Sequence, residues 1–261
     1  MITLSNETKK KFEEDAYVVL RENLFENEDF ERLKKYIMAF CQAIPEEIRH
    51  KNFANAPKLI PKIGDLISAP PVVNLVEQIL GPDIVSWSFG ICYKPANSPY
   101  RVPAHADSHF WLDWNLLEPN EVLGLFIPLT DLTVENGCLN VLPGVNQPKL
   151  YKHKSVDPNT NFFFKEIDDP EIDLSKLKPI EMKANQVCLI KENLIHSSEP
   201  NRSDKPRAAI TLRYISGKTK YNPHPSDVHR MYLIKGKNIA GNPQVKDIST
   251  AESYGGYSWS R

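Results

Sequence analysis

The stretch from residue 84 to residue 216 consists of short runs of β-branched and aromatic residues, and this pattern constrains the fold more than any other feature. Pro, Gly and Asn turn signals separate the runs. Many short strands joined by turns are typical of a β-sandwich or a β-barrel. The runs assigned to strands are Ile84–Lys94, Val122–Leu129, Cys138–Leu142, Gln186–Lys191 and Arg207–Ser216.

The first 82 residues carry mainly helical patterns. Apolar residues recur at helical spacing over residues 27–44. A further helix is expected from Pro70 or Pro71 to Leu80, because Pro is favoured in the first turn and a Gly follows the end. The remaining predicted elements are a charged helix over residues 5–15 and a short strand over residues 16–20.

We expect a single domain over residues 1–261, since all-β barrels of this size are commonly single domains. Its parts are a mostly helical N-terminal region (1–82) packed on the barrel, a β core (83–217) and a C-terminal extension (218–261). The polar tail after Gly236 is expected to be partly disordered.

Residues 148–179 form the one long stretch without a clear pattern. It is charged and polar apart from Phe162, Phe163 and Phe164. A segment this long inside a compact domain is often a lid or a binding loop. The alternative is a surface excursion whose three Phe side chains pack against the core, and the sequence leaves both open.

Composition argues against several classes of partner. Lys and Arg number 32 against 33 Asp and Glu, so no basic surface for nucleic acid or an acidic membrane is expected. The four cysteines are scattered, which argues against a disulfide framework. The N-terminus turns polar at once, and the longest apolar stretch, near residues 122–129, is far too short to span a membrane. We therefore expect a cytoplasmic protein.

The triplet His105-Ala-Asp107 places two possible metal ligands two residues apart. On a strand, such residues face the same side, so both can reach one ion. His196 follows an apolar strand candidate and offers a third ligand. Two His and one carboxylate leave three coordination positions open, which is the arrangement of non-haem Fe(II) oxygenases.

Arg207 opens a strand eleven positions after His196. An Arg buried in a barrel wall needs an anionic partner, and its planar fork matches a carboxylate. The distal carboxylate of 2-oxoglutarate is one such partner, and an ion pair with Glu199 is the structural alternative. The rival anchors in sequence are Lys205, Arg202 and Arg213.

Four segments, in this order, resemble motifs of the phytanoyl-CoA dioxygenase family of Fe(II)/2-oxoglutarate oxygenases. The resemblance extends from about Tyr93 to Tyr214. The segments are residues 93–98 (YKPANS), residues 105–111 (HADSHFW), residues 131–144 (DLTVENGCLNVLPG), and His196 with Ser198 and Arg207. One departure is Val145-Asn146, where the family often has Ser/Thr-His.

This resemblance implies a mainly β fold with flanking α-helices, a double-stranded β-helix or jelly-roll barrel of the cupin kind. It implies that Lys94 and Ser198 help Arg207 to bind 2-oxoglutarate, although Lys94 is otherwise an ordinary strand-end lysine. Phe126 aligns with an aromatic residue near the co-substrate. The candidate substrate contacts are His109, Trp111 and Phe163.

The resemblance also implies the reaction. Fe(II), 2-oxoglutarate and O2 would serve to hydroxylate, desaturate or cyclise at an unactivated C–H bond of a small metabolite, with release of succinate and CO2. Related halogenases lack the carboxylate ligand, which Asp107 supplies here. The alternatives are a cupin-like metal- or ligand-binding protein without oxygenase activity and a zinc hydrolase. The sequence does not identify the substrate, nor does it separate a monomer from a homodimer.

Overall fold

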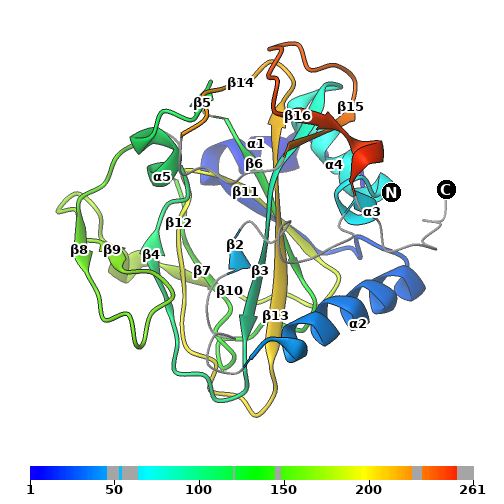
Figure 1. Cartoon of the computed structure of the whole chain (residues 1–261). Coiled ribbons are helices and arrows are strands. Elements are labelled where there is room, and N and C mark those ends of the chain that lie inside the picture. Colours follow the sequence, from blue (N-terminus) through cyan, green and yellow to red (C-terminus); the bar gives the residue numbers. More distant parts are fainter. Residues whose placement is uncertain (46–52, 55–63, 120, 145–147, 225–230, 252–261) are drawn as a thin grey trace.

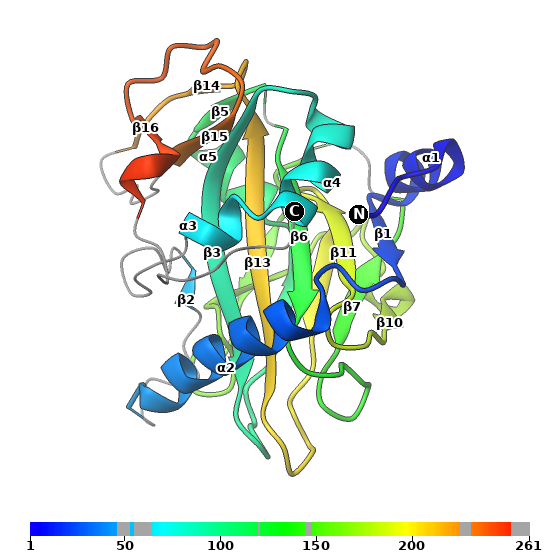
Figure 2. The same ribbon diagram turned by 90° about the vertical axis from the view of Figure 1, so that its right-hand side faces the viewer.

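The computed structural model describes residues 1–45, 53–54, 64–119, 121–144, 148–224 and 231–251. Two β-sheets lie face to face, and helices cover the outer face of the larger one (Figures 1 and 2). His50, Val145-Asn146, His229 and residues 252–261 lie outside the described residues. Within the described part of the chain, no helix is long and apolar enough to cross a membrane.

The larger sheet has eight strands, in the order β1-β11-β6-β13-β3-β15-β16, with β2 paired to β3 at one side. At its centre β13 runs antiparallel to β3, from Arg207 opposite Lys94 to Ser216 opposite Ile84. The strands are β1 (Tyr17–Leu20), β2 (Phe53–Ala54), β3 (Ile84–Lys94), β6 (Leu123–Pro128), β11 (Val187–Lys191), β13 (Arg207–Ser216), β15 (Met231–Lys235) and β16 (Val245–Asp247). Segments on both sides of the predicted core, β1 and β15–β16, thus join the barrel sheet.

The smaller sheet has the order β10-β7-β12-β4. Its strands are β4 (Val102–His105), β7 (Leu139–Leu142), β10 (Lys178–Ile180) and β12 (Ile195–Ser198). A short pair joins β5 (Leu117–Glu118) to β14 (Lys220–Tyr221). The two facing sheets, antiparallel except for the parallel pair β15–β16, form the jelly-roll barrel expected for the chain.

Side chains alternate along β13, and this alternation separates the core from the cavity. Ala208, Ile210, Leu212 and Tyr214 are buried in the cluster between the sheet and the helices. Arg207, Thr211 and Arg213 line a cavity between the two sheets instead. The strand therefore supplies apolar packing on one face and polar side chains on the other.

Helices α1 to α4 pack apolar side chains on the larger sheet (Figure 2). In α2 the buried residues include Phe30, Leu33 and Ile37, which have the predicted helical spacing. Ser5 caps α1, where its side chain accepts a hydrogen bond from the Thr8 amide. The helices are α1 (Asn6–Asp15), α2 (Asn27–Ala43), α3 (Gly64–Ile67), α4 (Pro70–Leu80) and α5 (Ser108–Asp113).

The stretch 148–179 contains more regular structure than its sequence suggests. A hairpin pairs β8 (His153–Ser155) with β9 (Lys165–Ile167), a 3-10 turn covers Leu174–Lys176, and β10 begins at Lys178. Each hairpin strand has three residues, too few to show an alternating pattern, so the expectation of one irregular loop is corrected here. Of its phenylalanines, Phe164 is exposed, whereas Phe162 and Phe163 are partly buried at the cavity.

Candidate metal centre

His105 and His196 face each other on neighbouring strands of the smaller sheet. His105 ends β4 and is register-paired with His196 in β12, and their ring centroids lie 4.1 Å apart. Asp107 completes the cluster, since ligand atoms of all three residues lie within 4.8 Å of one another. The structure thus brings together the three predicted metal ligands.

Asp107 reaches this cluster by a different route from the one expected. Strand β4 ends at His105, and Asp107 has helical backbone angles (φ −58°, ψ −37°) at the N-cap of α5. The amide of Ser108 donates to the Glu192 carbonyl at 2.8 Å, which ties this turn to the loop before β12. The two-residue spacing therefore works through a strand-to-helix turn rather than through alternation on a strand.

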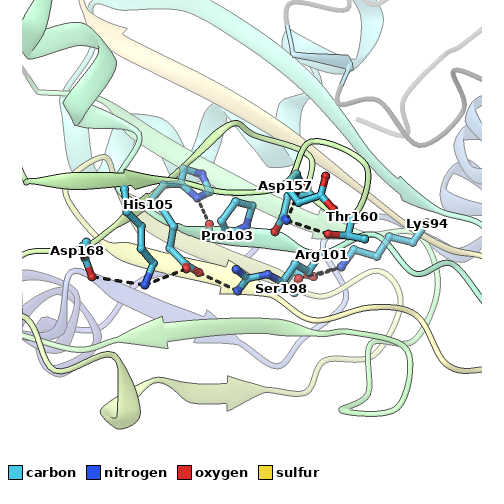
Figure 3. Close-up of polar contacts among 11 residues, drawn as sticks. Lys94, Arg101, Pro103, His105, Asp157, Thr160, Asp168 and Ser198 are labelled. Carbon is cyan, nitrogen blue, oxygen red and sulfur yellow. Dashed lines mark hydrogen bonds and ion pairs between the residues drawn. The ribbon is translucent and has the colours of Figure 1, made fainter.

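Both histidines have one ring nitrogen fixed by the backbone. Nδ1 of His105 lies 2.9 Å from the Pro103 carbonyl (Figure 3), and Nδ1 of His196 lies 2.9 Å from the Leu194 carbonyl. A carbonyl can only accept, so Nδ1 carries the proton and Nε2 keeps its lone pair. The local backbone therefore sets both imidazoles in the tautomer that binds a metal through Nε2.

Arg213 holds the carboxylate of Asp107. Its Nε donates to Oδ2 at 3.1 Å, and Nη2 donates to the same oxygen. The other oxygen, Oδ1, lies 3.5 Å from Nε2 of His105. Because one oxygen is engaged by Arg213, the carboxylate is set to offer a single oxygen to an ion beside the histidines.

The charge states of the cluster match those that a metal requires. Burial, reinforced by the neighbouring His105, lowers the pKa of His196 to about 4, so the imidazole is neutral at pH 7. Burial alone would raise the pKa of Asp107, but the charge of Arg213 opposes this effect, and the pKa lies well below its usual range. Two imidazole nitrogens and one carboxylate oxygen are the donor set that suits non-haem Fe(II).

Arg207 is buried on the cavity wall without an acidic partner among the described residues. Arg207 is only 1% exposed. Its Nε has no hydrogen-bond partner, and its Nη1 makes one long hydrogen bond, of 3.4 Å, to the Cys92 carbonyl. The alternative pairing with Glu199 is not formed. A buried guanidinium with unused donors fits the carboxylate of an anionic ligand.

Lys94 lies directly opposite Arg207 and is also buried, at 1% exposure. Its Nζ donates to Oγ of Ser198 at 2.8 Å and to the Ser198 carbonyl at 3.0 Å, as Figure 3 shows. Burial, together with the charge of Arg207, lowers the pKa of Lys94 to about 6. Lys94 is therefore not the ordinary exposed lysine of the alternative interpretation.

The turn at Asn136-Gly137 positions Ser198. Oγ of Ser198 donates to the Gly137 carbonyl at 2.8 Å. Gly137 has φ +73°, and a Cβ there would lie 2.1 Å from the Glu199 carbonyl oxygen. Glycine is thus required at position 137 both by the backbone conformation and by the close approach of the Glu199 backbone.

The cavity around these residues is mainly apolar. Phe126 lines it, with the guanidinium of Arg207 5.7 Å from the centre of the Phe126 ring. Phe163 also lines it, and its ring meets that of His105 edge-on at 4.8 Å. An apolar cavity with a few polar groups at one end is typical of a small-molecule site.

The β8–β9 hairpin is fixed beside β4 by charged side chains. Arg101, just before β4, pairs with Glu166 of β9 at 2.7 Å. Lys154 of β8 forms a further ion pair, with Asp168, at 3.4 Å (Figure 3). These contacts explain how Phe163, in the connection between β8 and β9, comes to lie on His105.

Two of the three candidate substrate contacts do not line the cavity. Trp111 is buried against Trp87, with ring centroids 4.4 Å apart, and belongs to a separate apolar cluster. His109 lies in α5, and its ring is 4.2 Å from that of His153. Because α5 is a helix, strand alternation from Asp107 does not bring the His109 ring to the cavity.

Sequence reasoning missed two residues that shape the site. Arg213 stood only as a rival anchor, yet it binds Asp107. Its even spacing from Arg207 on one strand was the available signal, since both side chains then face the cavity. Asn201 is buried and donates to the carbonyls of Pro95 and Lys205, at 2.8 Å each, and so closes the loop between β12 and β13.

Comparison with known proteins gives one family. The model of the phytanoyl-CoA dioxygenase (PhyH) family matches residues 12–209. Peroxisomal phytanoyl-CoA dioxygenase of Rattus norvegicus is 26% identical over 242 residues, which cover 84% of this chain and 70% of that protein. A phytanoyl-CoA dioxygenase domain-containing protein 1 homolog of Dictyostelium discoideum is 32% identical over 120 residues, which cover 45% of this chain and 41% of that protein.

Solved structures share the fold. Apo ThoJ, a non-haem monooxygenase, has a TM-score of 0.69 at 20% identity, over 93% of this chain and 88% of its own. EctD of S. alaskensis, solved with 2-oxoglutarate and 5-hydroxyectoine, has a TM-score of 0.66 at 18% identity, over 94% of this chain and 89% of its own. At these identities the likeness establishes the jelly-roll architecture.

Proposed function

The chain belongs to the phytanoyl-CoA dioxygenase family, and from this premise we propose that it hydroxylates an unactivated C–H bond of a small metabolite, or desaturates or cyclises there, with release of succinate and CO2. Membership of the family makes it a non-haem iron enzyme that depends on 2-oxoglutarate. The substrate bond and the products are the proposed part.

One observation carries the proposal: the three ligand atoms lie within 4.8 Å of one another in the form that binds a metal. His105, Asp107 and His196 would hold Fe(II). Arg207, whose Nε has no hydrogen-bond partner in the described structure, would receive a carboxylate of 2-oxoglutarate, with Lys94, Ser198 and Phe126 around it. When bound, iron and 2-oxoglutarate supply the O2-dependent oxidising chemistry.

The chain's own residues would orient the reactants and limit water. Arg213 restrains Asp107 to one oxygen, which keeps coordination positions free. Phe163 covers one side of His105, and Phe126 covers Arg207. A drier cavity strengthens the attraction between Arg207 and a carboxylate. The carboxylate ligand, absent from related halogenases, favours hydroxylation, desaturation or cyclisation.

The substrate is proposed to be a small molecule rather than a nucleic acid, since the net charge is near zero and the cavity is mainly apolar. Phe163 is proposed to contact it, because this ring lies beside His105. His109 and Trp111 remain weaker candidates. We further propose a cytoplasmic monomer or homodimer, and the four free cysteines support a reducing compartment.

The test is Asp107→Ala, with Asp131→Ala as the matched control. Asp131 is an exposed carboxylate that pairs with Lys183 and not with a residue of the metal cluster. We expect Asp107→Ala to abolish succinate formation from 2-oxoglutarate, while Asp131→Ala retains it. Normal turnover in Asp107→Ala would refute the ligand assignment. Iron binding without any turnover in the unaltered chain, across a panel of small metabolites, would favour a metal-binding barrel.

A further inference from the structure

A second pair of histidines lies close to the first in sequence and in fold. His109 belongs to α5, which begins directly after Asp107, and His153 is the first residue of β8. Their ring centroids lie 4.2 Å apart with an interplanar angle of 53°. The corresponding values for the proposed iron ligands His105 and His196 are 4.1 Å and 51°. The distance between ring centres and the interplanar angle are therefore nearly the same in the two pairs.

His153 is oriented in the same way as the proposed iron ligands. Its Nδ1 lies 2.9 Å from the carbonyl of Tyr151, two residues earlier, as in His105 and His196. The carbonyl fixes the proton on Nδ1, so Nε2 keeps a lone pair for a metal. His153 is only partly buried, which leaves the ring open to an ion from solution.

Charged groups of both signs lie near this pair, so some favour a bound cation and others oppose it. Burial lowers the pKa of His153, which favours the neutral imidazole that binds a metal. Asp113 lies one turn after His109 on α5, and its charge favours a cation there. Asp169 acts likewise on His153, whereas Lys165 opposes a cation at both rings.

We propose that His109 and His153 form a second site, separate from the iron cluster, for a divalent transition metal ion that binds neutral imidazole, with Zn²⁺ as the representative. Imidazole is a common ligand for this class of ion, and water can fill the remaining positions. The ion would join α5 to the β8–β9 hairpin. Both border the iron cluster, since α5 starts after Asp107 and Phe163 of the hairpin connection contacts His105.

The experiment measures Zn²⁺ stoichiometry by equilibrium dialysis of the untagged full chain at pH 7.5. His153→Ala is the test variant, and His153→Gln repeats the test with a hydrogen-bonding side chain of similar length. His224→Ala is the control, since the His224 ring stacks on that of Trp114. Circular dichroism of each variant checks that it is folded.

We expect two equivalents of Zn²⁺ in the unaltered chain and in His224→Ala, but one in both His153 variants. One equivalent in the unaltered chain and none in the variants would uphold this site and refute the iron cluster as a metal site. Equal stoichiometry in the unaltered chain and the His153 variants would overturn the inference. The second site and the proposed function are thus tested independently.

Discussion

Arg213 engages one carboxylate oxygen of Asp107 through two of its nitrogens, Nε at 3.1 Å and Nη2. The ring of Trp111 lies under the guanidinium, 5.8 Å from it, and helps to fix its orientation. The pair links the central strand β13 to the turn that carries the carboxylate ligand. Arg213 is therefore a positioning residue: it acts on the metal through Asp107.

Arg213→Lys is expected to weaken Fe(II) binding by about 10- to 100-fold, the usual effect of losing a partner that orients a metal ligand. A lysine keeps the charge but lacks the planar fork that donates from both Nε and Nη2 to one carboxylate oxygen. The measurement is anaerobic competition for Fe(II) against a chelator of known affinity.

The control for this prediction is Arg32→Lys, which alters an Arg–Asp pair of similar length, 2.7 Å, in α2. We expect Fe(II) affinity in this variant to equal that of the unaltered chain. Unchanged affinity in Arg213→Lys would show that Asp107 needs no help in orientation.

Binding of 2-oxoglutarate is expected to take up a proton at Lys94. With its pKa lowered to about 6, Lys94 is mostly neutral at pH 7.5, and a nearby carboxylate would raise this pKa and restore the charge. The affinity for 2-oxoglutarate should therefore be constant below pH 6 and fall as the pH rises above it.

Calorimetry of the iron-loaded protein under argon, in buffers with different ionisation enthalpies, measures the proton uptake. We expect uptake approaching one proton at pH 7.5, and its loss in Lys94→Met. Lys205→Met, at an exposed position, should behave like the unaltered chain. Proton release, or uptake that persists in Lys94→Met, would exclude Lys94 as the titrating group.

Gly137→Ala is expected to destabilise the protein by roughly 3 kcal/mol, because it adds both backbone strain and a clash with the Glu199 carbonyl. Gly241→Ala separates the two effects. Gly241 has φ +69°, and nothing lies within 4 Å of its Cβ position, so only the strain of about 1 kcal/mol should remain.

Urea denaturation of both variants gives the comparison. A larger loss in Gly137→Ala than in Gly241→Ala measures the cost of the close approach. Similar losses at both positions would mean that the Ser198–Glu199 backbone moves freely away from the turn.

The sequence predicts the barrel strands well because their pattern is local. Residues 84–94 and 207–216 are strands with the expected bounds, since both combine β-branched residues with clear turn signals at their ends. The helix over residues 70–80 also agrees, because Pro at the start and Gly after the end fix its limits. Such signals depend only on neighbouring residues.

The sequence predicts less where distant contacts decide the outcome. Asp107 leaves strand β4 because the Ser108 amide pairs with Glu192, which lies 84 positions away. The β8–β9 hairpin depends on ion pairs such as Arg101 with Glu166. The contact of Arg213 with Asp107 depends likewise on the fold. No local pattern records these contacts, so only the three-dimensional structure reveals them.

We propose that His105, Asp107 and His196 would hold Fe(II) and that Arg207 would anchor 2-oxoglutarate beside it. The direct test is anaerobic: Fe(II) and then 2-oxoglutarate are added to the apo-protein, and the visible charge-transfer band of the chelate is titrated. We predict that the band appears, that Arg207→Ala needs about 10- to 100-fold more 2-oxoglutarate, and that Arg202→Ala, at an exposed position, is unchanged. Absence of the band with iron demonstrably bound would contradict the proposed binding of 2-oxoglutarate at the iron site.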